Sequence, residues 1–478
     1  MSTQKFDYVI RVLTTPQDVD ACQWNALLAT QQDANPFMRH EYLAALHESA
    51  AARAKTGWTP RFMTLWRGGR LEDKRGGQLV AACPLYIKAH SYGEYVFDWA
   101  WANAYQQHGL NYYPKAVVAV PFTPVPGARL MAQTQADREA LVQALIAWCG
   151  NEKLSSLHLL FANEDDIAAC ATAGLMLRHT VQFHWENVAP KLVVSPAALA
   201  LQAAPLPESA PLQAVTACAG SPQAAAQSPE RANFFKGGPS KNSSPIGRAF
   251  NSFDEFLASL SQEKRKKIRQ ERRKVVDAGV RFRWSLGADI ATADWDFFYR
   301  CYERTYLEHG NAPYLSRDFF QRMADTMPQN WLLFVAERHG KEIATSLIAI
   351  DAYYKRDTAK NSSQNPVNFD VSDDSANHHQ IAYGRYWGAL ERVDCLHFEA
   401  CYYQPLQWCI EQGYKRFEGG AQGEHKMARA LMPVITTSAH WLAQPAFADA
   451  VERFLAREGE GIDNYMDGLS LRSPFRCK

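Results

Sequence analysis

Several features that would assign a chain to a special class are missing from this sequence. No run of apolar residues approaches the ~20 that a membrane-spanning helix requires. The first residues lack the basic, apolar and small-residue segments of a secretion signal. The 10 cysteines are irregularly spaced and contain no CxxC pair, which argues against a disulfide framework and against a metal cluster. We therefore expect a cytoplasmic chain with no transmembrane segment and no bound metal.

The charges nearly cancel, since 51 lysines and arginines face 50 aspartates and glutamates. A chain without an overall field does not attract DNA, so we expect no DNA partner, and any electrostatic partner must be bound by a local patch. The apolar fraction of 47%, with 12% aromatics, is far above that of a disordered chain. A length of 478 residues is enough for two or three packed domains.

Two polar stretches divide the sequence. Ala, Pro, Ser and Gln dominate residues 195–247, and such a segment cannot bury enough apolar surface to offset its ordering entropy. A second polar stretch, residues 355–379, is typical of a long surface loop between strands. We therefore predict a first domain over residues 1–190, a linker over 191–250, and a second domain over 251–478 that carries an inserted loop at 355–379.

The two halves outside these stretches follow one plan. Each has a helix that starts near a proline, Pro36 or Pro313, then two strands joined by a glycine turn, then a helix that leads into a strand. Trp-Cys pairs at 148–149 and 408–409 hold matching places, and Gly413 stands where a helix should end. These units also recur by chance in α/β proteins, but their shared order argues for a repeat. The predicted fold class is α/β (α+β), with mixed sheets flanked by helices.

Four stretches resemble one known family. Residues 397–433, HFEACYYQPLQWCIEQGYKRFEGGAQGEHKMARALMP, resemble the signature of the FemAB-like proteins, a group of N-acyltransferases in the GNAT superfamily. Residues 108–130, 182–187 and 252–275 are similar to the same family. The resemblance implies tandem GNAT-like acyltransferase domains and transfer of an acyl group to an amine, with bacterial Fem-type relatives building peptide bridges on cell-wall precursors.

The resemblance also implies the co-substrates. The donor is acyl-CoA or aminoacyl-tRNA, with no tightly bound cofactor, and the acceptor is a small-molecule or lipid-linked amine. A tRNA partner and peripheral contact with a membrane are compatible with this chemistry. The sequence departs from acetyl-CoA enzymes in one respect, because it lacks the [Gln/Arg]-x-x-Gly-x-[Gly/Ala] loop whose N–H groups bind a pyrophosphate, and residues 106–111 are the nearest approach.

Acyl transfer to an amine needs a base for the ammonium proton, a proton donor for the leaving group, and donors where the oxyanion forms. The glycines of 419–423 allow close backbone approach, and three polar residues follow them. Just upstream, a helix that Pro405 should kink carries a glutamate and two tyrosines on one face. A solvated turn and a buried Glu–Tyr pair are the structural alternatives. The candidate catalytic residues are Glu399, Tyr402, Tyr403, Glu424, His425 and Lys426.

A region of the first half rich in proline and glycine suits an anionic ligand, because three prolines at 121, 124 and 126 fix the loop between two cations. Ordinary surface charges are the alternative. The candidate binding residues here are His108, Tyr112, Lys115, Thr123 and Arg129. In the second half we add Gln422 and Arg385, which together with Lys426 would hold the anionic part of a substrate.

Residues 264–274 hold eight cations in eleven positions. The apolar stripe beside them should pack, which leaves a charged face able to neutralise phosphates of a tRNA or a lipid-linked precursor. Lys264, Arg265 and Arg269 are the candidate binding residues of this helix. A nuclear-localisation or DNA-binding function is weaker because the chain is neutral overall, and a merely solvated face is the other alternative.

The sequence thus predicts an N-acyltransferase or aminoacyltransferase that moves an acyl group from a thioester or aminoacyl ester to an amine. Glu399 or His425 would take the amine proton, and Tyr402 or Tyr403 would assist the leaving group. The alternative is a non-catalytic module that binds peptidoglycan precursor or RNA through the basic helix.

Overall fold

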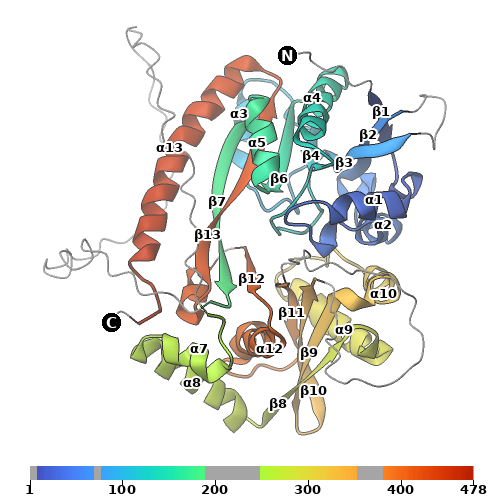
Figure 1. Ribbon diagram of the computed structural model, residues 1–478. Coiled ribbons are helices and arrows are strands. Elements are labelled where there is room, and N and C mark those ends of the chain that lie inside the picture. Colours follow the sequence, from blue (N-terminus) through green and yellow to red (C-terminus); the bar gives the residue numbers. More distant parts are fainter. Residues whose placement is uncertain (1–7, 69–76, 189–247, 352–379, 422, 477–478) are drawn as a thin grey trace, which may run out of the picture.

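The computed structural model describes residues 8–68, 77–188, 248–351, 380–421 and 423–476. Residues 191–247 of the predicted linker, the whole predicted loop insertion at 355–379 and Gln422 therefore lie outside the described residues. The described chain forms one large mixed sheet with helices packed on both faces (Figure 1).

The first half supplies seven strands and five α-helices among its described residues. The strands are β1 (Tyr8–Leu13), β2 (Trp58–Arg67), β3 (Gln78–Lys88), β4 (Lys115–Val118), β5 (Met131–Ala132), β6 (Ser156–Ala162) and β7 (Met176–Glu186). The helices are α1 (Ala21–Ala29), α2 (His40–Glu48), α3 (Trp99–Gln107), α4 (Gln135–Asn151) and α5 (Glu164–Thr172).

The second half supplies the remaining elements of the described chain. Its strands are β8 (Val280–Leu286), β9 (Trp331–Arg338), β10 (Lys341–Ile350), β11 (Ile381–Ala389), β12 (Arg416–Ala421) and β13 (Met432–Leu442). Its helices are α7 (Phe253–Ser259), α8 (Gln262–Asp277), α9 (Thr292–Glu308), α10 (Arg317–Thr326), α11 (Leu396–Phe398), the π-helix η6 (Glu399–Tyr403), α12 (Gln404–Gln412), the 3-10 helix η7 (Glu424–Arg429) and α13 (Pro445–Ser470).

The strand order is symmetric about its centre. It runs β1-β2-β3-β4-β6-β13-β7-β12-β11-β10-β9-β8, so that each half contributes the last strand of its own order to the other half. Strand β7 pairs with β12, strand β13 pairs with β6, and the two exchanged strands pair with each other. Figure 1 shows β7 and β13 as the long ribbon that joins the halves, with α13 running beside it.

The two halves repeat one plan, as the sequence predicts. Each contains a single parallel contact of three residue pairs, β4 with β6 and β11 with β12, among otherwise antiparallel strands. The predicted fold class, α/β with mixed strand pairing and flanking helices, is confirmed. The domain boundaries remain a prediction.

Local sequence signals explain where turns and helices begin or end. The β9–β10 hairpin turns at His339 and Gly340, whose φ angles of 51° and 74° match the two-residue turn that fits twisted strands. Helix α12 ends at Gly413 in the left-handed conformation, as predicted. The predicted helix start at Pro313 is wrong, because α10 begins at Arg317 after Ser316, whose side chain accepts the Phe319 N–H.

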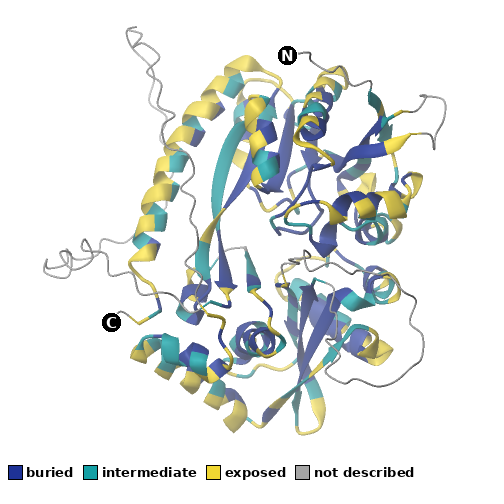
Figure 2. Ribbon diagram, viewed as in Figure 1, coloured by how far each residue is buried: buried dark blue, intermediate teal, exposed yellow. Residues whose placement is uncertain are grey.

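The core joins the two halves. One apolar cluster contains side chains of α2 from the first half and of α9, α10 and β11 from the second. Edge-to-face ring pairs cross this boundary, with centroids 5.4 Å apart for Phe37 and Tyr383 and for Tyr42 and Phe319. The strands are buried and the outer helix faces exposed (Figure 2). Among the described helices, none combines the length and apolar character needed to cross a bilayer.

Candidate active site

A cleft opens where β11 and β12 separate. Their parallel pairing ends at Tyr383 opposite Glu418, and the next residues of both strands line a cavity of about 250 Å³. A second cavity of about 350 Å³ shares four lining residues with the first. The shared residues are Tyr302, Tyr306, Arg385 and Tyr386. The two cavities therefore form one cleft between strand ends of the second half.

Irregularities in both strands produce this separation. On β11, Leu347 pairs with Tyr386 and Ile348 with Gly384, so Arg385 is an extra residue without a partner on β10. On β12, residues 419–420 stand opposite the single residue Phe183 of β7. Bulges of this kind increase strand twist and re-aim side chains, and they are frequent beside active sites.

The glycines of β12 keep the cleft open. Gly420 has a φ of 78°, which favours glycine, and a Cβ atom there would meet only the Gly384 carbonyl oxygen, at 3.8 Å. A larger side chain would therefore extend into the separation between the strands. The glycine-rich stretch that the sequence marks as a site does border the cleft, through Gly419 and Gly420.

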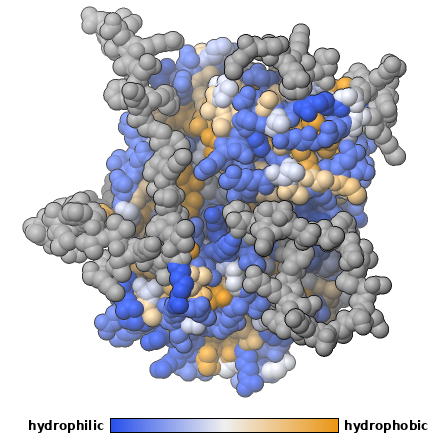
Figure 3. All heavy atoms as spheres, in the orientation of Figure 1, coloured by the Kyte–Doolittle hydropathy of each residue, from blue (hydrophilic) through white to orange (hydrophobic). Residues whose placement is uncertain are grey.

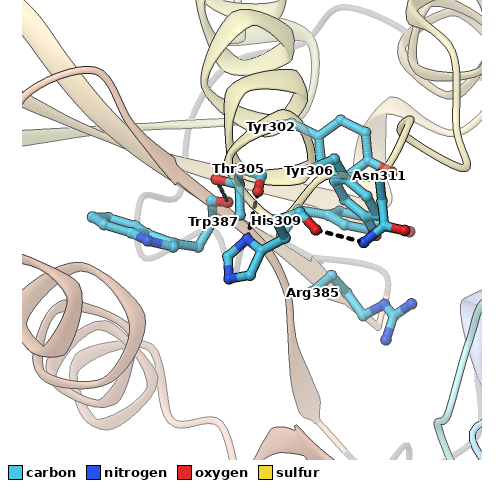
Figure 4. Close-up of a pocket in the computed structure, with 8 residues that line it drawn as sticks. Tyr302, Thr305, Tyr306, His309, Asn311, Arg385 and Trp387 are labelled. Atoms are coloured by element: carbon cyan, nitrogen blue, oxygen red, sulfur yellow. Dashed lines mark hydrogen bonds between the residues drawn. The ribbon is translucent and has the colours of Figure 1, made fainter.

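Aromatic rings form the walls of the cleft. Tyr302 and Tyr306 project from α9, and Figure 4 shows them grouped above Arg385, which points away from Trp387. The first half supplies part of the wall, including Tyr95 and Phe122. The cleft thus lies between the halves, although its floor belongs to the second.

Arg385 is the sequence-predicted binding residue that lines both cavities. Its Nη2 donates a hydrogen bond of 2.9 Å to the Phe122 carbonyl oxygen. The guanidinium carbon lies 5.2 Å from the Phe37 ring centre and 5.1 Å from that of Tyr386. The fixed proline loop of the first half therefore meets the predicted cation of the second half at the cleft.

Two carboxyl groups lie next to the end of the strand pairing, Glu418 buried and Asp351 partly exposed. Glu418 is 5% exposed, and burial raises its pKa to about 8. Its Oε2 has no hydrogen-bond partner among the described residues, and ring nitrogen Nδ1 of His184 and Nη1 of Arg416 each lie 3.9 Å from Oε1. Burial also raises the pKa of Asp351 to about 7, although this carboxylate accepts hydrogen bonds from the Ile381 N–H at 3.0 Å and from the Tyr383 hydroxyl.

Glu418 and the tyrosines of α9 are not among the residues predicted from the sequence. Glu418 lies in strand β12, directly before the glycines of 419–420. A carboxylate directly before a glycine pair at a strand end was the available signal. Nothing in the sequence places Tyr302 and Tyr306 beside β11, because that contact is made by packing of distant segments.

The predicted catalytic residues lie together on the other face of the sheet. Tyr402 and Tyr403 pack with Ala382 and Phe417, whereas Tyr383 and Tyr386 pack in the cluster that faces the cleft. Successive strand residues point to opposite faces, so Ala382 and Tyr383 mark the two sides of β11. The predicted group and the cleft are thus separated by the sheet itself.

Within this group the acids are paired. Glu399 is bound by Arg272 at 2.9 Å and by the Gln404 amide at 2.7 Å. The Tyr403 hydroxyl donates to buried Glu271. Pro405 follows the π-helix η6, which is the local irregularity that the sequence led us to expect.

The rest of the group surrounds η7. The Tyr402 hydroxyl lies 3.3 Å from His425 Nε2. Glu424 is exposed and accepts hydrogen bonds of 2.9 Å from Tyr465 and from Arg472. Lys426 connects this group to the cleft, because its ammonium donates to the Gly420 carbonyl oxygen at 3.0 Å, and burial lowers its pKa to about 8.

The predicted cations of the first half are buried, so the alternative that they are surface charges is wrong. Lys115 is 0% exposed and donates to Ser91 and Glu94 at 2.8 Å and to Asp98. Arg129 is 1% exposed, and its guanidinium donates to main-chain carbonyls of its own loop. Neither residue lines the two cavities, and burial lowers the pKa of Arg129 to about 10.

The other predicted residues of the first half differ in position. The Tyr112 hydroxyl donates to Asp98 at 2.6 Å, inside the buried network of Lys115. His108 is exposed at the end of α3 and contacts the Ala104 carbonyl oxygen. Thr123 is buried between Phe122 and Pro124, which both line the cleft, and lies 3.3 Å from the Tyr42 hydroxyl.

The basic helix forms as predicted. In α8, Ile268 and Val275 are buried while Arg269 is exposed and Lys264 and Arg265 are partly exposed. The surface over α7 and α8 is mainly hydrophilic (Figure 3). The phosphate-binding function of this face remains a prediction.

The first half has an equivalent strand separation, but side chains fill it. Strands β4 and β6 also pair over three residues, and residues 160–161 then bulge against β13 as 419–420 do against β7. Phe161 holds the place of Gly420 with the same sign of φ, 57° against 78°. Leu160 and Phe161 are buried in the core, and Leu159, at the register position of Glu418, packs with α4 and α5 on the opposite face of the sheet. The first half therefore lacks both the opening and the carboxylate.

Comparisons with known proteins find one matching family. Residues 15–191, 242–372 and 374–477 match a family model described as peptidoglycan biosynthesis/recognition. No curated protein sequence matches the chain.

Several solved structures resemble the fold at low identity. The C-terminal domain of a protein assigned as a lysylphosphatidylglycerol synthetase from Agrobacterium fabrum is 8% identical, with 91% of this chain and 95% of that chain covered and a TM-score of 0.43. L-PGS from Bacillus licheniformis is 10% identical, with 91% and 97% covered and a TM-score of 0.42. A tandem GNAT protein from the clavulanic acid biosynthesis pathway is 10% identical, with 92% and 99% covered and a TM-score of 0.37.

Proposed function

We propose that this chain, which belongs to the FemAB-like family, transfers an acyl or aminoacyl group from a thioester or ester donor to an amine of a cell-wall precursor. The observation that carries the proposal is the cleft at the separation of β11 and β12, which brings a buried carboxyl group next to a cavity with aromatic walls. The donor is acyl-CoA or an aminoacyl-tRNA.

Glu418 is the base that we assign to this reaction. An amine acceptor arrives as an ammonium ion and attacks a carbonyl carbon only after it loses a proton. A carboxylate with a pKa of about 8 accepts that proton far more readily than an ordinary carboxylate, and the best general bases titrate near the working pH. The nitrogen then bonds to the carbonyl carbon, the bond from that carbon to the sulfur or oxygen of the donor breaks, and the leaving group takes up a proton.

The reacting centre belongs to the second half alone. The same strand separation in the first half is occupied by Leu160 and Phe161, and the register position of Glu418 holds Leu159 rather than a carboxylate. The first half contributes instead to the wall of the cleft through Tyr95 and Phe122. Duplication of the fold has therefore left one site rather than two.

A matched pair of substitutions tests this assignment. Gly420→Phe copies the first half into the second and should abolish transfer, at a backbone cost of about 1–2 kcal/mol for the left-handed conformation. Phe161→Gly makes the reverse change, which should cost about 3 kcal/mol of stability through the cavity left behind while activity remains. If the Gly420→Phe variant fails to fold, Gly420→Ala is the smaller substitution for the same test.

The assay is product formation, followed by mass spectrometry, from acyl-CoAs or charged tRNA with lipid-linked peptidoglycan precursors as acceptors. Loss of activity in Gly420→Phe but not in Phe161→Gly supports the proposal. Full activity of a folded Gly420→Phe variant contradicts it. His425→Ala and Glu399→Ala in the same assay test whether the base lies instead on the opposite face of the sheet.

A non-catalytic binding function is the second candidate, and the exposed cations of α8 favour it. A binding module would keep its affinity for tRNA or precursor in the Gly420→Phe variant and would give no product in any variant.

A further inference from the structure

Arg385 carries a positive charge that the described protein does not neutralise. No carboxylate of the described residues lies within ion-pair distance of its guanidinium, whereas Arg67, Arg138 and Arg272 each form an ion pair with an acidic side chain. Its Nη2 reaches one carbonyl oxygen, and its Nε is buried without a hydrogen-bond partner in the described chain. A buried donor left unpaired costs free energy that a bound acceptor would recover.

The described residues that line the cavity around Arg385 include no acidic side chain. The residues that line the two cavities include tyrosines, a threonine, a histidine and an asparagine, but neither aspartate nor glutamate. In Figure 4 the guanidinium is joined by no hydrogen bond to the other residues drawn. A cation between aromatic walls, with no counter-ion in the described lining, favours a ligand that brings an anion together with a flat or apolar surface.

Opposite charges lie at different places around the cleft. Arg385 borders both cavities, whereas Glu418 and Asp351 line neither cavity and lie beside them, where the pairing of β11 and β12 ends. An acceptor with one charge of each sign fits this arrangement in a single orientation. Its amine would face the carboxylates and its anionic group the guanidinium.

We propose that the acceptor is an amine that also carries a carboxylate or phosphate, and that Arg385 binds this anionic group against the tyrosines of α9. The proposal rests on the proposed function, because it names the chemistry of the acceptor in the same cleft. Arg385 also links the halves through the Phe122 carbonyl and the Phe37 ring, but that structural contact would give no preference for a charged ligand.

Hippurate and its neutral amide, hippuramide, test this inference, since they share a planar ring and differ by one negative charge. We expect hippurate to bind the wild-type protein at least about 10-fold more tightly in calorimetric titrations, because hydrogen bonds to a charged partner are the stronger ones. Phenyl phosphate in the same titration distinguishes a phosphate site from a carboxylate site. Whichever of hippurate and phenyl phosphate binds more tightly carries the group that the site accepts.

Arg385→Met should remove the preference, and Arg385→Lys should retain part of it. Arg392→Met is the matched control, because Arg392 is an exposed cation just beyond the same strand. Equal binding of hippurate and hippuramide, a preference that survives Arg385→Met, or no saturable binding of either anion up to about 10 mM overturns the proposal. The comparison of hippurate with hippuramide on the wild-type protein tests the proposal even if the Arg385→Met variant does not fold.

These titrations need no turnover, so they separate the two proposals. A charge preference that depends on Arg385 supports the anion site even where Glu418→Gln keeps full activity, a result that would refute only the assigned base. An inactive Glu418→Gln with no charge preference in the wild type would refute only the anion site.

Discussion

Replacing Glu418 by Gln should make the protein more stable at neutral pH while it removes activity. The pKa of this carboxyl is about 8 in the folded chain, against 4.5 for an ordinary glutamate. Between these values the folded state keeps a proton that the unfolded state has released. Because the unfolded state binds fewer protons, stability falls as the pH rises through this window, by about 1.4 kcal/mol per pH unit for one such group.

The difference in unfolding free energy between Glu418→Gln and wild type isolates the contribution of the Glu418 proton, since glutamine does not titrate. Asp351 lies nearby, partly exposed and with a pKa of about 7, so the two carboxyls share the effect. We expect the advantage of Glu418→Gln to grow by roughly 0.7–1.4 kcal/mol per unit between pH 5 and pH 7.5. Product formation should fall by about 100-fold or more, the usual contribution of a general base.

Urea unfolding at three pH values, followed by tryptophan fluorescence, measures this growth. Glu424→Gln is the control, because Glu424 is exposed and paired with Arg472, and surface pairs contribute ~1 kcal/mol or less. If the extra stability of Glu418→Gln over wild type stays constant or shrinks with rising pH, the reasoning is refuted. A fully active Glu418→Gln variant would refute the catalytic assignment separately.

Three further changes test other contacts. Wild-type stability should rise between pH 8 and pH 10.5 relative to Lys426→Met, because the buried ammonium with a pKa of about 8 releases its proton before the unfolded chain does, and parallel unfolding curves would contradict this. Arg272→Ala should destabilise the fold by about 2–4 kcal/mol by leaving Glu399 buried without its cation, and adding Glu399→Gln should restore part of the loss in urea titrations. Joint replacement of Arg265 and Arg269 by Ser should lower the slope of log affinity for tRNA against log salt by about 1.4, and an unchanged slope in fluorescence anisotropy would rule out phosphate contacts.

Local signals made the fold predictable. Turn glycines, helix-ending glycines and the period of apolar residues act within a few residues, so the hairpins and the repeated plan can be read from the sequence. The exchange of β7 and β13 could not be read, because these strands pair with partners more than two hundred positions away and nothing local distinguishes them from ordinary final strands. The helix start at Arg317 was missed for a smaller reason, since Ser316 competed with Pro313 as a start signal.

The site could be predicted only in part. Arg385 and the glycines of 419–420 were found because a cation and a glycine pair are visible as residue types. Glu418 was not, because what singles it out is burial without a hydrogen bond on Oε2, which depends on distant segments. Lys115 shows the opposite case. The sequence suggests a cation that binds a ligand, but in the fold Lys115 forms an ion pair with Asp98, which stands seventeen positions earlier.

The exchanged strands make each half incomplete without the other. Strand β12 has β7 as its neighbour on one side, and β13 lies between β6 and β7, so either half alone would expose the edges of two buried strands. The cleft would also lose Phe122, whose carbonyl oxygen holds Arg385. We therefore expect residues 1–188 and 248–478, produced as separate chains, to be insoluble alone and to form an active one-to-one complex when produced together. Size-exclusion chromatography with the transfer assay measures both properties, and a second half that folds and works alone would show that the reacting centre does not need the first.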